Sequence, residues 1–434
     1  MTVMARRHLG RLRAWHLAVA AALGVGVSGA AMAQRFEGNK PLDLPYGPPP
    51  SDGAMEGVDA RRSGATRAPL PSRDLRVAWH KSMGEATGYP PVVGADGAVF
   101  AVGGRGDILE VDASGAERSR VSVGLGLPGP ASLLTGGTLV LVNNSGEAVG
   151  VRSGRVVFRT RVSDRSPSSR ADPLPLEDGG VVVEAAGELS LLDGQGNVRA
   201  RATLPERAAW SLLGTSSSIV AVTAEGRTYT WEPGREPVRA GDLGGHVMGR
   251  PVLVGDHTLL GVVDGTHLEA LDLVKGIAVT RAAANGGEWF LGPPAMSRGV
   301  LYLLAWTPTS VLLLGVGAAG QEPRRVAVST FGTSLLADGG VPSPPPARAS
   351  LLVDPGGTVA FRTPEDAIGV VTPAGEVITM GESFCGPALP GLTARGSPVP
   401  PARTLRGFAG MSAAGPGALM LGCADGQLVK IESR

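Results

Sequence analysis

Residues 416–434, PGALMLGCADGQLVKIESR, decide the fold because they contain part of a unit that residues 88–124 contain in full. The full unit, GYPPVVGADGAVFAVGGRGDILEVDASGAERSRVSVG, has four short apolar runs separated by Asp-Gly, Gly-Gly and Ser-Gly turns. This pattern predicts four β-strands joined by tight hairpins. The C-terminal stretch contains the second strand, the turn and the third strand, so its fourth strand must come from elsewhere.

The same unit recurs along the chain at intervals of about forty residues, which is typical of propeller blades. A sandwich, the alternative all-β plan, would not repeat one hairpin in this way. We therefore predict an all-β, eight-bladed β-propeller over residues 73–434, with seven blades as the second choice. The predicted units begin near Gly88, Leu127, Ala171, Trp210, Gly249, Gly292, Gly332 and Gly386.

The fourth strand of the last unit is predicted to be DLRVAWHKSM, residues 74–83. Val77 and Trp79 occupy the positions that Val157 and Arg159 occupy in another predicted fourth strand. A blade shared by both chain ends closes the ring and covers sheet edges that would otherwise promote aggregation.

The first 33 residues read as an export signal. Four arginines precede the apolar run LAVAAALGVGVSGA, and Ala31-Met32-Ala33 is a cleavage pattern, so the mature chain would begin at Gln34. The run is too short to span a bilayer, and we predict no stable membrane insertion. An ordinary secretion signal is preferred to a twin-arginine signal. The periplasm is the predicted location, with the extracellular space as the alternative.

Residues 34–72 are rich in Pro, Gly and charge and lack hydrophobic periodicity. They are predicted to be a disordered linker. Without residues 1–33 the chain keeps 36 basic and 39 acidic residues, a net charge of about −3. No run of basic residues is present, so nucleic acid is not a predicted partner.

The unit resembles the pyrroloquinoline-quinone-like (PQQ-like) propeller repeat, P-x-V-x-x-x-G-x-V-Y-V-G-x-x-x-G-x-L-x-A-L-D-x-x-x-G. Residues 91–115 match it best, residues 251–276 match it next, and Asp112, Asp193 and Asp272 fall at its Asp position. Eight blades in an exported chain also look like the BamB-type scaffold of outer-membrane protein assembly. That scaffold is normally a lipoprotein, whose lipid is carried by a Cys directly after the cleavage site. Here the residue directly after the cleavage pattern is Gln34.

Quinone-dependent dehydrogenases, which share this repeat, hold their cofactor over the propeller axis with a vicinal disulfide, a Ca²⁺ cage and a catalytic Asp. Cys385 and Cys423 are not adjacent, and a Trp at the blade end appears only once, as Trp79. The chain contains no CxxCH haem site and no GxSxG elbow. We therefore predict no enzyme activity and no cofactor, with a quinoprotein dehydrogenase as the alternative.

Two other motifs have simple structural interpretations. His246, His267 and Asp264 are predicted to lie on one face and could bind a metal, but solvated loop residues are the preferred interpretation. Arg105-Gly106-Asp107 looks like an integrin-binding tripeptide, yet it occupies a turn that is NSGE or AEGR in other units. A plain turn is preferred, and no metal site is predicted.

The two cysteines are predicted to form a disulfide, as is usual in exported proteins. Cys385 lies in the crossing into the last blade and Cys423 ends the second strand of that blade, so both fall on one face. Two buried thiols are the alternative.

Candidate partner-binding residues lie on the face that carries the second-to-third-strand turns and the crossings between blades. Two Pro-rich segments, residues 342–348 and 398–403, would project there as stiff arms or serve as spacers. The turns form a mildly acidic rim, and two aromatic residues are either surface anchors or core residues. The candidates are Arg105, Asp107, Glu147, Glu188, Glu225, Arg227, Asp264, His267, Trp289, Trp306, Pro344, Pro345, Pro346, Arg348, Glu365, Asp366, Pro400, Pro401, Arg403 and Asp425.

These observations predict a non-catalytic, exported propeller that binds envelope proteins, in a role such as outer-membrane protein assembly. A carbohydrate-binding or adhesion propeller is a further alternative. The repeat alone does not identify the partner, because propellers reuse one scaffold for unrelated functions.

Overall fold

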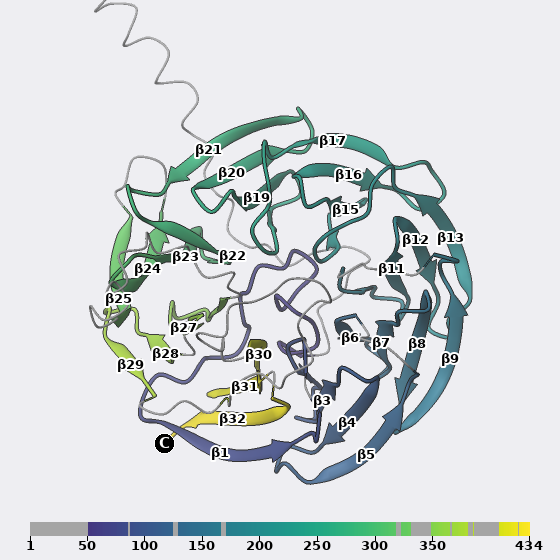
Figure 1. The fold of residues 1–434 in the computed structure, drawn as a ribbon, viewed down its shortest axis with the longest axis horizontal. Helices are drawn as coiled ribbons and strands as arrows, with labels where there is room; N and C mark the ends of the chain where they lie inside the picture. Colours follow the sequence, from purple (N-terminus) through teal and green to yellow (C-terminus); the bar gives the residue numbers. More distant parts are fainter. Residues whose placement is uncertain are drawn as a thin grey trace, which may run out of the picture.

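The computed structural model describes residues 51–434 except 86, 125–128, 166–170, 318–322, 331–348, 365–366, 381–384, 386–407 and 424. These residues form eight four-stranded antiparallel sheets, which stand in a ring like the blades of a propeller (Figure 1). The predicted all-β, eight-bladed fold is confirmed, and the seven-bladed alternative is excluded. No helix in the described part of the chain is long and apolar enough to span a membrane.

Seven blades run from an inner strand to an outer strand in sequence order, and blade 8 has β1 as its outer strand. Blade 1 contains β2 (Val92–Val93), β3 (Val99–Val102), β4 (Asp107–Val111) and β5 (Glu117–Ser122). Blade 2 contains β6 (Ala131–Leu133), β7 (Leu139–Val142), β8 (Glu147–Arg152) and β9 (Arg155–Arg161). Blade 3 contains β10 (Leu174–Pro175), β11 (Val181–Ala185), β12 (Glu188–Leu192) and β13 (Val198–Thr203). Blade 4 contains β14 (Leu213–Gly214), β15 (Ile219–Val222), β16 (Arg227–Trp231) and β17 (Val238–Asp242).

The second half of the ring follows the same plan. Blade 5 contains β18 (Val252–Val254), β19 (Thr258–Val263), β20 (His267–Asp272) and β21 (Ile277–Ala283). Blade 6 contains β22 (Trp289–Ser297), β23 (Val300–Trp306), β24 (Ser310–Val316) and β25 (Arg324–Thr330). Blade 7 contains β26 (Ser350–Val353), β27 (Val359–Arg362), β28 (Ile368–Val371) and β29 (Val377–Thr379). Blade 8 contains β30 (Phe408–Ala413), β31 (Ala418–Cys423), β32 (Gln427–Ser433) and β1 (Leu75–Ser82).

The blades expose more side-chain surface from the axis outward. In blade 1 every residue of β3 is buried, whereas β5, with the sequence ERSRVS, has no buried residue. The second strands are almost wholly aliphatic because both of their faces pack against neighbouring blades. Eight apolar clusters fill the eight interfaces between blades, so the core forms a ring around the axis.

Blade 8 closes the ring with strands from both chain ends, as predicted. β1 pairs antiparallel with β32, from Leu75 opposite Ser433 to Ser82 opposite Gln427. The cluster between blades 8 and 1 then joins Met420 and Leu428 to Leu109 of the first blade. The strand missing from residues 416–434 is therefore supplied from the N-terminal side of the ring.

Residues 51–70 form an axial segment that enters the centre of the ring (Figure 1). The prediction of a disordered linker over residues 34–72 is wrong for this described part, because Ala54, Val58 and Arg62 are at most 2% exposed. The composition of the segment misled the prediction, since many of its contacts are made by backbone carbonyl groups. Residues 1–50, including the predicted signal, lie outside the described residues.

The carbonyl groups of the axial segment accept hydrogen bonds from the inner edges of successive blades. Donors and acceptors follow one another around the ring, with N···O distances of 2.7–3.0 Å. An unpaired buried N–H costs free energy. The segment therefore supplies acceptors for N–H groups that the inner strands cannot pair within their own blades. Six pairs have donors in inner strands, and these are, donor first, Val93 to Gly53, Leu133 to Ala54, Gly214 to Ala60, Leu253 to Arg61, Met296 to Ser63 and Val353 to Gly64. In blade 8 the donor to Pro69 is Gly417, in the turn between β30 and β31.

Blade 3 lacks this hydrogen bond for a covalent reason. The residue that corresponds to Val93 and Leu133 in its inner strand is Pro175, which has no N–H. The side chain of Arg62 contacts this blade instead, and its Nη2 donates to the carbonyl of Pro173 at 3.1 Å. Two further donations reach the carbonyls of Leu212, at 3.1 Å, and Glu56, at 2.6 Å.

We predict that Arg62→Ala destabilises the protein by about 3–5 kcal/mol, because it leaves three buried carbonyls and the Asp172 carboxylate without their cation. Denaturant unfolding measures the loss. Arg73→Ala, at an exposed position just outside the segment, is the control and should change the unfolding free energy little. Equal effects of the two variants would contradict the assigned role of Arg62.

The predicted disulfide is present between Cys385 and Cys423, whose Cα atoms are 5.2 Å apart. Both cysteines belong to the apolar cluster between blades 7 and 8. The bridge therefore ties the crossing into blade 8 to the sheet that joins the two chain ends.

Replacing both cysteines by alanine should cost about 4 kcal/mol of unfolding free energy, because the bridge closes a loop of 38 residues. Thermal unfolding with and without a reductant tests this. Alkylation without reduction should add no label, and alkylation after reduction should add two. Labelling of the unreduced protein would contradict the bridge.

Candidate functional site

A cluster of buried charges holds the axial segment in place. The Arg62 guanidinium lies 3.7 Å from the Asp172 carboxylate, and the Arg250 guanidinium lies 3.0 Å from that of Glu56. Asp172 also accepts a hydrogen bond of 2.5 Å from the Ser211 hydroxyl. The cluster joins the segment to the starts of blades 3, 4 and 5. The ionisation of Asp172 and Glu56 therefore affects how strongly the segment is held.

The backbone around this cluster bends sharply. Gly57 has φ of +79°, and a Cβ atom there would lie 2.8 Å from Cζ of Arg250, so neither the conformation nor the space suits another residue. The Asp59 carboxylate accepts hydrogen bonds from the backbone N–H of Ser63, at 2.9 Å, and from its hydroxyl, at 2.8 Å. These contacts fix the turn that presents Arg62.

Burial raises the pKa of Asp172 to about 7, and the Glu56 carboxylate acts in the same direction, against the lowering effect of Arg62. Burial also raises the pKa of Asp59, which hydrogen bonds from Ser63 partly oppose. Folding therefore favours the protonated form of Asp172, and the stability gained from it is complete below the unfolded pKa, near 4, and lost as the pH rises through 7.

We predict that the unfolding free energy of the wild-type protein falls relative to that of Asp172→Asn between pH 5 and pH 8. The amide cannot ionise, so the variant lacks this proton linkage. Asp193→Asn is the control, since Asp193 is exposed and hydrogen bonds lower its pKa, so it stays ionised in this range. Parallel pH profiles for the wild type and Asp172→Asn would contradict the assignment.

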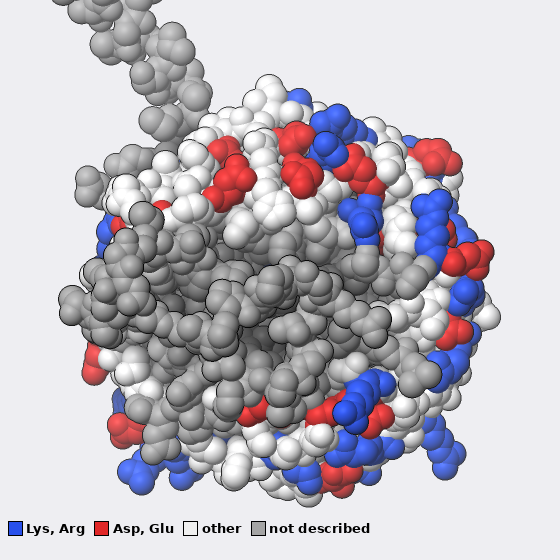
Figure 2. Space-filling model, viewed as in Figure 1, with Lys and Arg blue, Asp and Glu red and all other residues white. Residues whose placement is uncertain are grey.

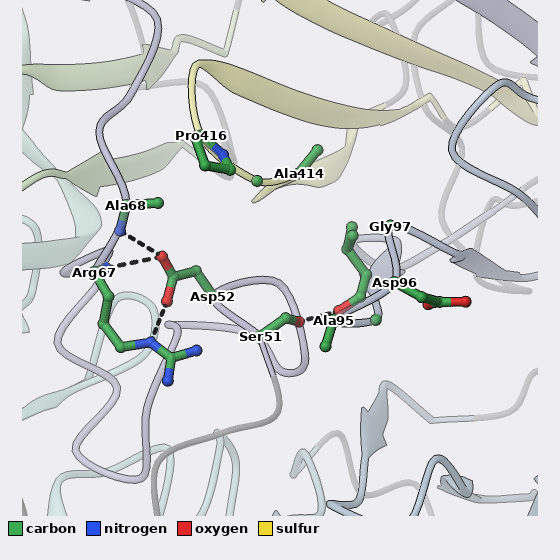
Figure 3. Close-up of a pocket in the computed structure, with 12 residues that line it drawn as sticks. Ser51, Asp52, Arg67, Ala68, Ala95, Asp96, Gly97, Ala414 and Pro416 are labelled. Carbon is green, nitrogen blue, oxygen red and sulfur yellow. Dashed lines mark hydrogen bonds and ion pairs between the residues drawn. The ribbon is translucent and has the colours of Figure 1, made fainter.

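A cavity of about 560 Å³ opens beside the two ends of the axial segment (Figure 3). The Asp52 carboxylate joins these ends by accepting hydrogen bonds from the backbone N–H groups of Arg67, at 2.8 Å, and Ala68, at 2.9 Å, and from Nε of Arg67, at 2.7 Å. The Arg67 side chain is 52% exposed and can meet a carboxylate from a partner. The lining is completed by Ser51, Val93, Gly94, Ala95, Asp96, Gly97, Ala414, Gly415 and Pro416.

The opposite face, which we call the crossing face, carries the second-to-third-strand turns and the connections between blades. The predicted rim residues Arg105, Asp107, Glu147, Glu188 and Glu225 occupy these turns, and none is buried. Arg227, Asp264, His267 and Asp425 do the same in blades 4, 5 and 8. Their placement on one face follows from the antiparallel order of the strands.

Much of this rim is paired internally. Glu147 lies 3.7 Å from Arg159, and Glu225 lies 3.7 Å from His246. Arg227 pairs with Glu206. Cations and anions alternate around the rim of the molecule (Figure 2), so the expected acidic character is weakened by neighbouring arginines.

The remaining predicted residues divide into three groups. Trp306 is 7% exposed and packs between blades 6 and 7, so it is a core residue and its use as a surface anchor is wrong. Trp289 is only partly buried against the same cluster. Glu365, Asp366 and both Pro-rich arms, with Pro344, Pro345, Pro346, Arg348, Pro400, Pro401 and Arg403, lie outside the described residues.

His246, Asp264 and His267, which the sequence placed on one face, are exposed residues at the crossing face of blades 4 and 5. Nδ1 of His267 lies 2.9 Å from the Thr266 hydroxyl, and the backbone N–H of His246 donates to the Asp264 carboxylate at 3.0 Å. Over the described ranges, no three His, Cys, Asp or Glu residues are grouped so as to hold a metal ion. These side chains therefore act as turn and surface residues.

Trp79 joins blade 8 to blade 1. Its indole N–H donates to the carbonyl of Ala113 at 2.9 Å, and a Cβ at Gly115 would lie 2.8 Å from its ring. Phe158 covers Gly196 of the next blade in the same way, and Arg324 donates to the carbonyls of Pro373 and Ala374. Aromatic and arginine side chains thus share the bracing role that the sequence suggested only for Trp79.

Sequence reasoning missed the axial segment. Its available signal was EGVDARRSG, residues 56–64, in which two acidic residues are followed by two arginines between two glycines. A solvated linker does not need acidic and basic residues so close together. The stretch contains no repeat or periodicity, however, that would identify it as an ordered element.

Comparison with known proteins identifies the fold. No protein-family model and no curated protein matches the chain. The solved structure of BamB from Moraxella catarrhalis is 14% identical, with a TM-score of 0.56 over 83% of this chain and 98% of that one. The quinohemoprotein alcohol dehydrogenase from Comamonas testosteroni is 11% identical, with a TM-score of 0.60 over 93% and 84%. The chain thus shares the propeller fold of these proteins, in agreement with the repeat.

The computationally designed Ika8 protein is also similar, with 12% identity and a TM-score of 0.59 over 84% of this chain and 99% of that one. A scaffold, an enzyme and a design therefore share this architecture. At these identities the likeness concerns the fold alone, and function has to be argued from the residues.

The described residues do not fit a quinone and its Ca²⁺ ion. The cysteines of the disulfide are 38 positions apart and lie between two blades, whereas the enzymes use adjacent cysteines over the axis. The channel between the inner strands is filled by the chain's own residues 53–66. We therefore derive no chemistry through a quinone.

Proposed function

We propose that this protein is a non-catalytic, exported β-propeller that binds other proteins of the cell envelope. The observation that carries the proposal is the axial segment, because it fills the channel with backbone and buried ion pairs. A ligand-binding propeller would need that space for a small molecule. The remaining means of recognition are the two faces and the rim.

Export is supported by the N-terminal sequence and by the disulfide, which is a bond of oxidising compartments. The similarity to BamB agrees with an envelope location and is a fold-level analogy. Together they favour the periplasm.

The crossing face is the proposed partner-binding surface. It carries the half-buried Glu188 and the exposed Glu225 in hairpin turns. In the sequence, both Pro-rich segments lie between the last strand of one blade and the first strand of the next. Rigid turns and stiff arms lose little conformational entropy on binding. The cavity at Arg67 lies on the other face and would serve a separate contact.

A quinoprotein dehydrogenase remains the second candidate, favoured by the similarity to the Comamonas enzyme. The filled channel is the observation against it. A carbohydrate-binding role is weakened by the burial of Trp306, since sugars need an exposed aromatic face.

Cross-linking and affinity capture from the native envelope test the proposal. We expect recurrent cross-links from the crossing face to a small set of envelope proteins. Replacing residues 342–348 or 398–403 with Gly/Ser segments of equal length should reduce capture several-fold. Arg235→Ser, at an exposed turn on the opposite face, is the matched control and should leave capture unchanged.

Capture that survives both replacements would reduce the arms to spacers. Failure to recover any protein would overturn the scaffold proposal, and saturable binding of a quinone with Ca²⁺ would replace it with the enzyme candidate.

A further inference from the structure

The outer strands of the blades are free sheet edges, and most are protected against pairing. In blades 1–6 and 8 a register shift interrupts the pairing of the outer strand with its neighbour. Such bulges and charged side chains are the usual means of blocking edge-to-edge association.

The protection can be compared over the four-residue runs in which outer strands pair regularly. The run in β5 contains Arg120, that in β9 contains Arg159 and Arg161, and that in β13 contains Arg201. The run in β25 contains Arg324 and Arg325, and that in β1 contains Lys81. Among the described outer strands, regular runs of this length therefore carry a cation, with one exception.

The exception is β21 of blade 5. Its regular run, Ile277 to Thr280, is uncharged, and the register shift comes only at its end, beside Arg281. Ile277 is 58% exposed and Val279 is 52% exposed. Val274, in the turn before the strand, is 73% exposed. We call these three residues and Ala278 the β21 patch.

A further exposed apolar side chain lies on an outer strand of the neighbouring blade. Val238 of β17 is 64% exposed, and β17 approaches the start of β21, where a Cβ at Gly276 would lie 3.1 Å from the carbonyl oxygen of Ala240. Three of the large, exposed apolar side chains thus belong to two adjacent outer strands, and Val274 lies in the turn before one of them. Isolated apolar residues on a surface are ordinary, but a group along an unprotected edge is not.

We propose that the β21 patch is a self-association surface, on which β21 of a second copy of this chain pairs antiparallel across a two-fold axis. The two four-stranded blades then form one continuous eight-stranded sheet. This inference is independent of the proposed scaffold function, because it concerns the rim and not the crossing face.

The sequence of the run is self-complementary. If Ala278 lies opposite Ala278 of the partner subunit, then Ile277 lies opposite the partner's Val279 and Val279 opposite the partner's Ile277. Opposed residues of antiparallel strands share a face, so four β-branched side chains form one cluster. Val279 also pairs with Ala270, which packs between blades 5 and 6, so the cluster continues that core.

The shape of the molecule permits this contact. β21 lies on the convex outside of the ring (Figure 1), so two discs can meet edge to edge. A two-fold pairing uses the same surface on both copies and closes at the dimer. A strand from a different protein could use the same edge, but nothing in β21 selects such a strand, whereas its own sequence matches it.

Sedimentation equilibrium of the purified protein, from about 1 to about 100 µM, tests the proposal. We expect a reversible dimer. Val279→Lys should raise the dissociation constant at least about tenfold, the equivalent of about 1.4 kcal/mol, because it places a cation in the run. Val157→Lys is the matched control, since Val157 is 50% exposed at the edge of β9, among arginines, and should leave the dimer unchanged.

A second variant tests the register. Ala278→Cys should give a covalent dimer on mild oxidation, because opposed Cβ atoms across an antiparallel pair lie about 4.5–5.5 Å apart. Ala200→Cys, in the arginine-bearing run of β13, should remain monomeric after the same treatment.

A wild-type protein that stays monomeric at the highest concentration overturns the proposal. A dimer that is insensitive to Val279→Lys, or that Ala278→Cys does not link, also overturns it. Capture of a different protein through β21 by a monomeric chain would assign the edge to that partner instead.

Discussion

The inner edges of the blades carry backbone N–H groups that need acceptors, and the carbonyl groups of residues 53–69 supply them. A propeller usually leaves its innermost strands facing a channel that water can enter. Here one stretch of chain accepts hydrogen bonds from successive blades. In blade 3, where Pro175 has no N–H to donate, the Arg62 side chain makes the contact. The buried charges around Arg62, the cavity at Arg67 and the loss of axial binding space all follow from this arrangement.

The outer part of the ring depends on a second constraint, the pairing of β1 with β32. It completes a sheet from both chain ends, and the disulfide anchors the same blade. The axial segment leads directly into β1, so the inner ring of hydrogen bonds and the outer closure are made by one continuous piece of chain. Blade 8 is therefore the place where all three constraints meet.

The blades could be predicted because each is encoded in the side chains of its own residues. Alternating aliphatic residues and turn glycines specify a hairpin wherever they occur, and the incomplete unit at residues 416–434 indicated which strand was missing. The Cys385–Cys423 bridge followed from topology. Trp306 was ambiguous because the sequence does not show which side of the blade is covered.

The axial segment could not be predicted because its partners recognise peptide groups, which every sequence has. Gly53, Ala54 and Ala60 contribute carbonyl oxygens, and no hydrophobic pattern reports on these. Pro175 illustrates the same limit. It reads as a weak strand residue, yet its missing N–H explains why Arg62 donates to blade 3. The crossing-face residues were placed correctly in their turns, but their ion pairs depend on neighbours distant in sequence.

The hydrogen bonds of the axial segment also connect residues that are far apart in the sequence. Residues 53–69 are synthesised before every blade, yet their donors extend from Val93 to Gly417. The partners of this segment thus span nearly the whole chain. Such long-range closure slows folding, and it keeps the chain incomplete until its final strand has emerged. The full set of these hydrogen bonds can therefore be present only after Gly417 has been synthesised.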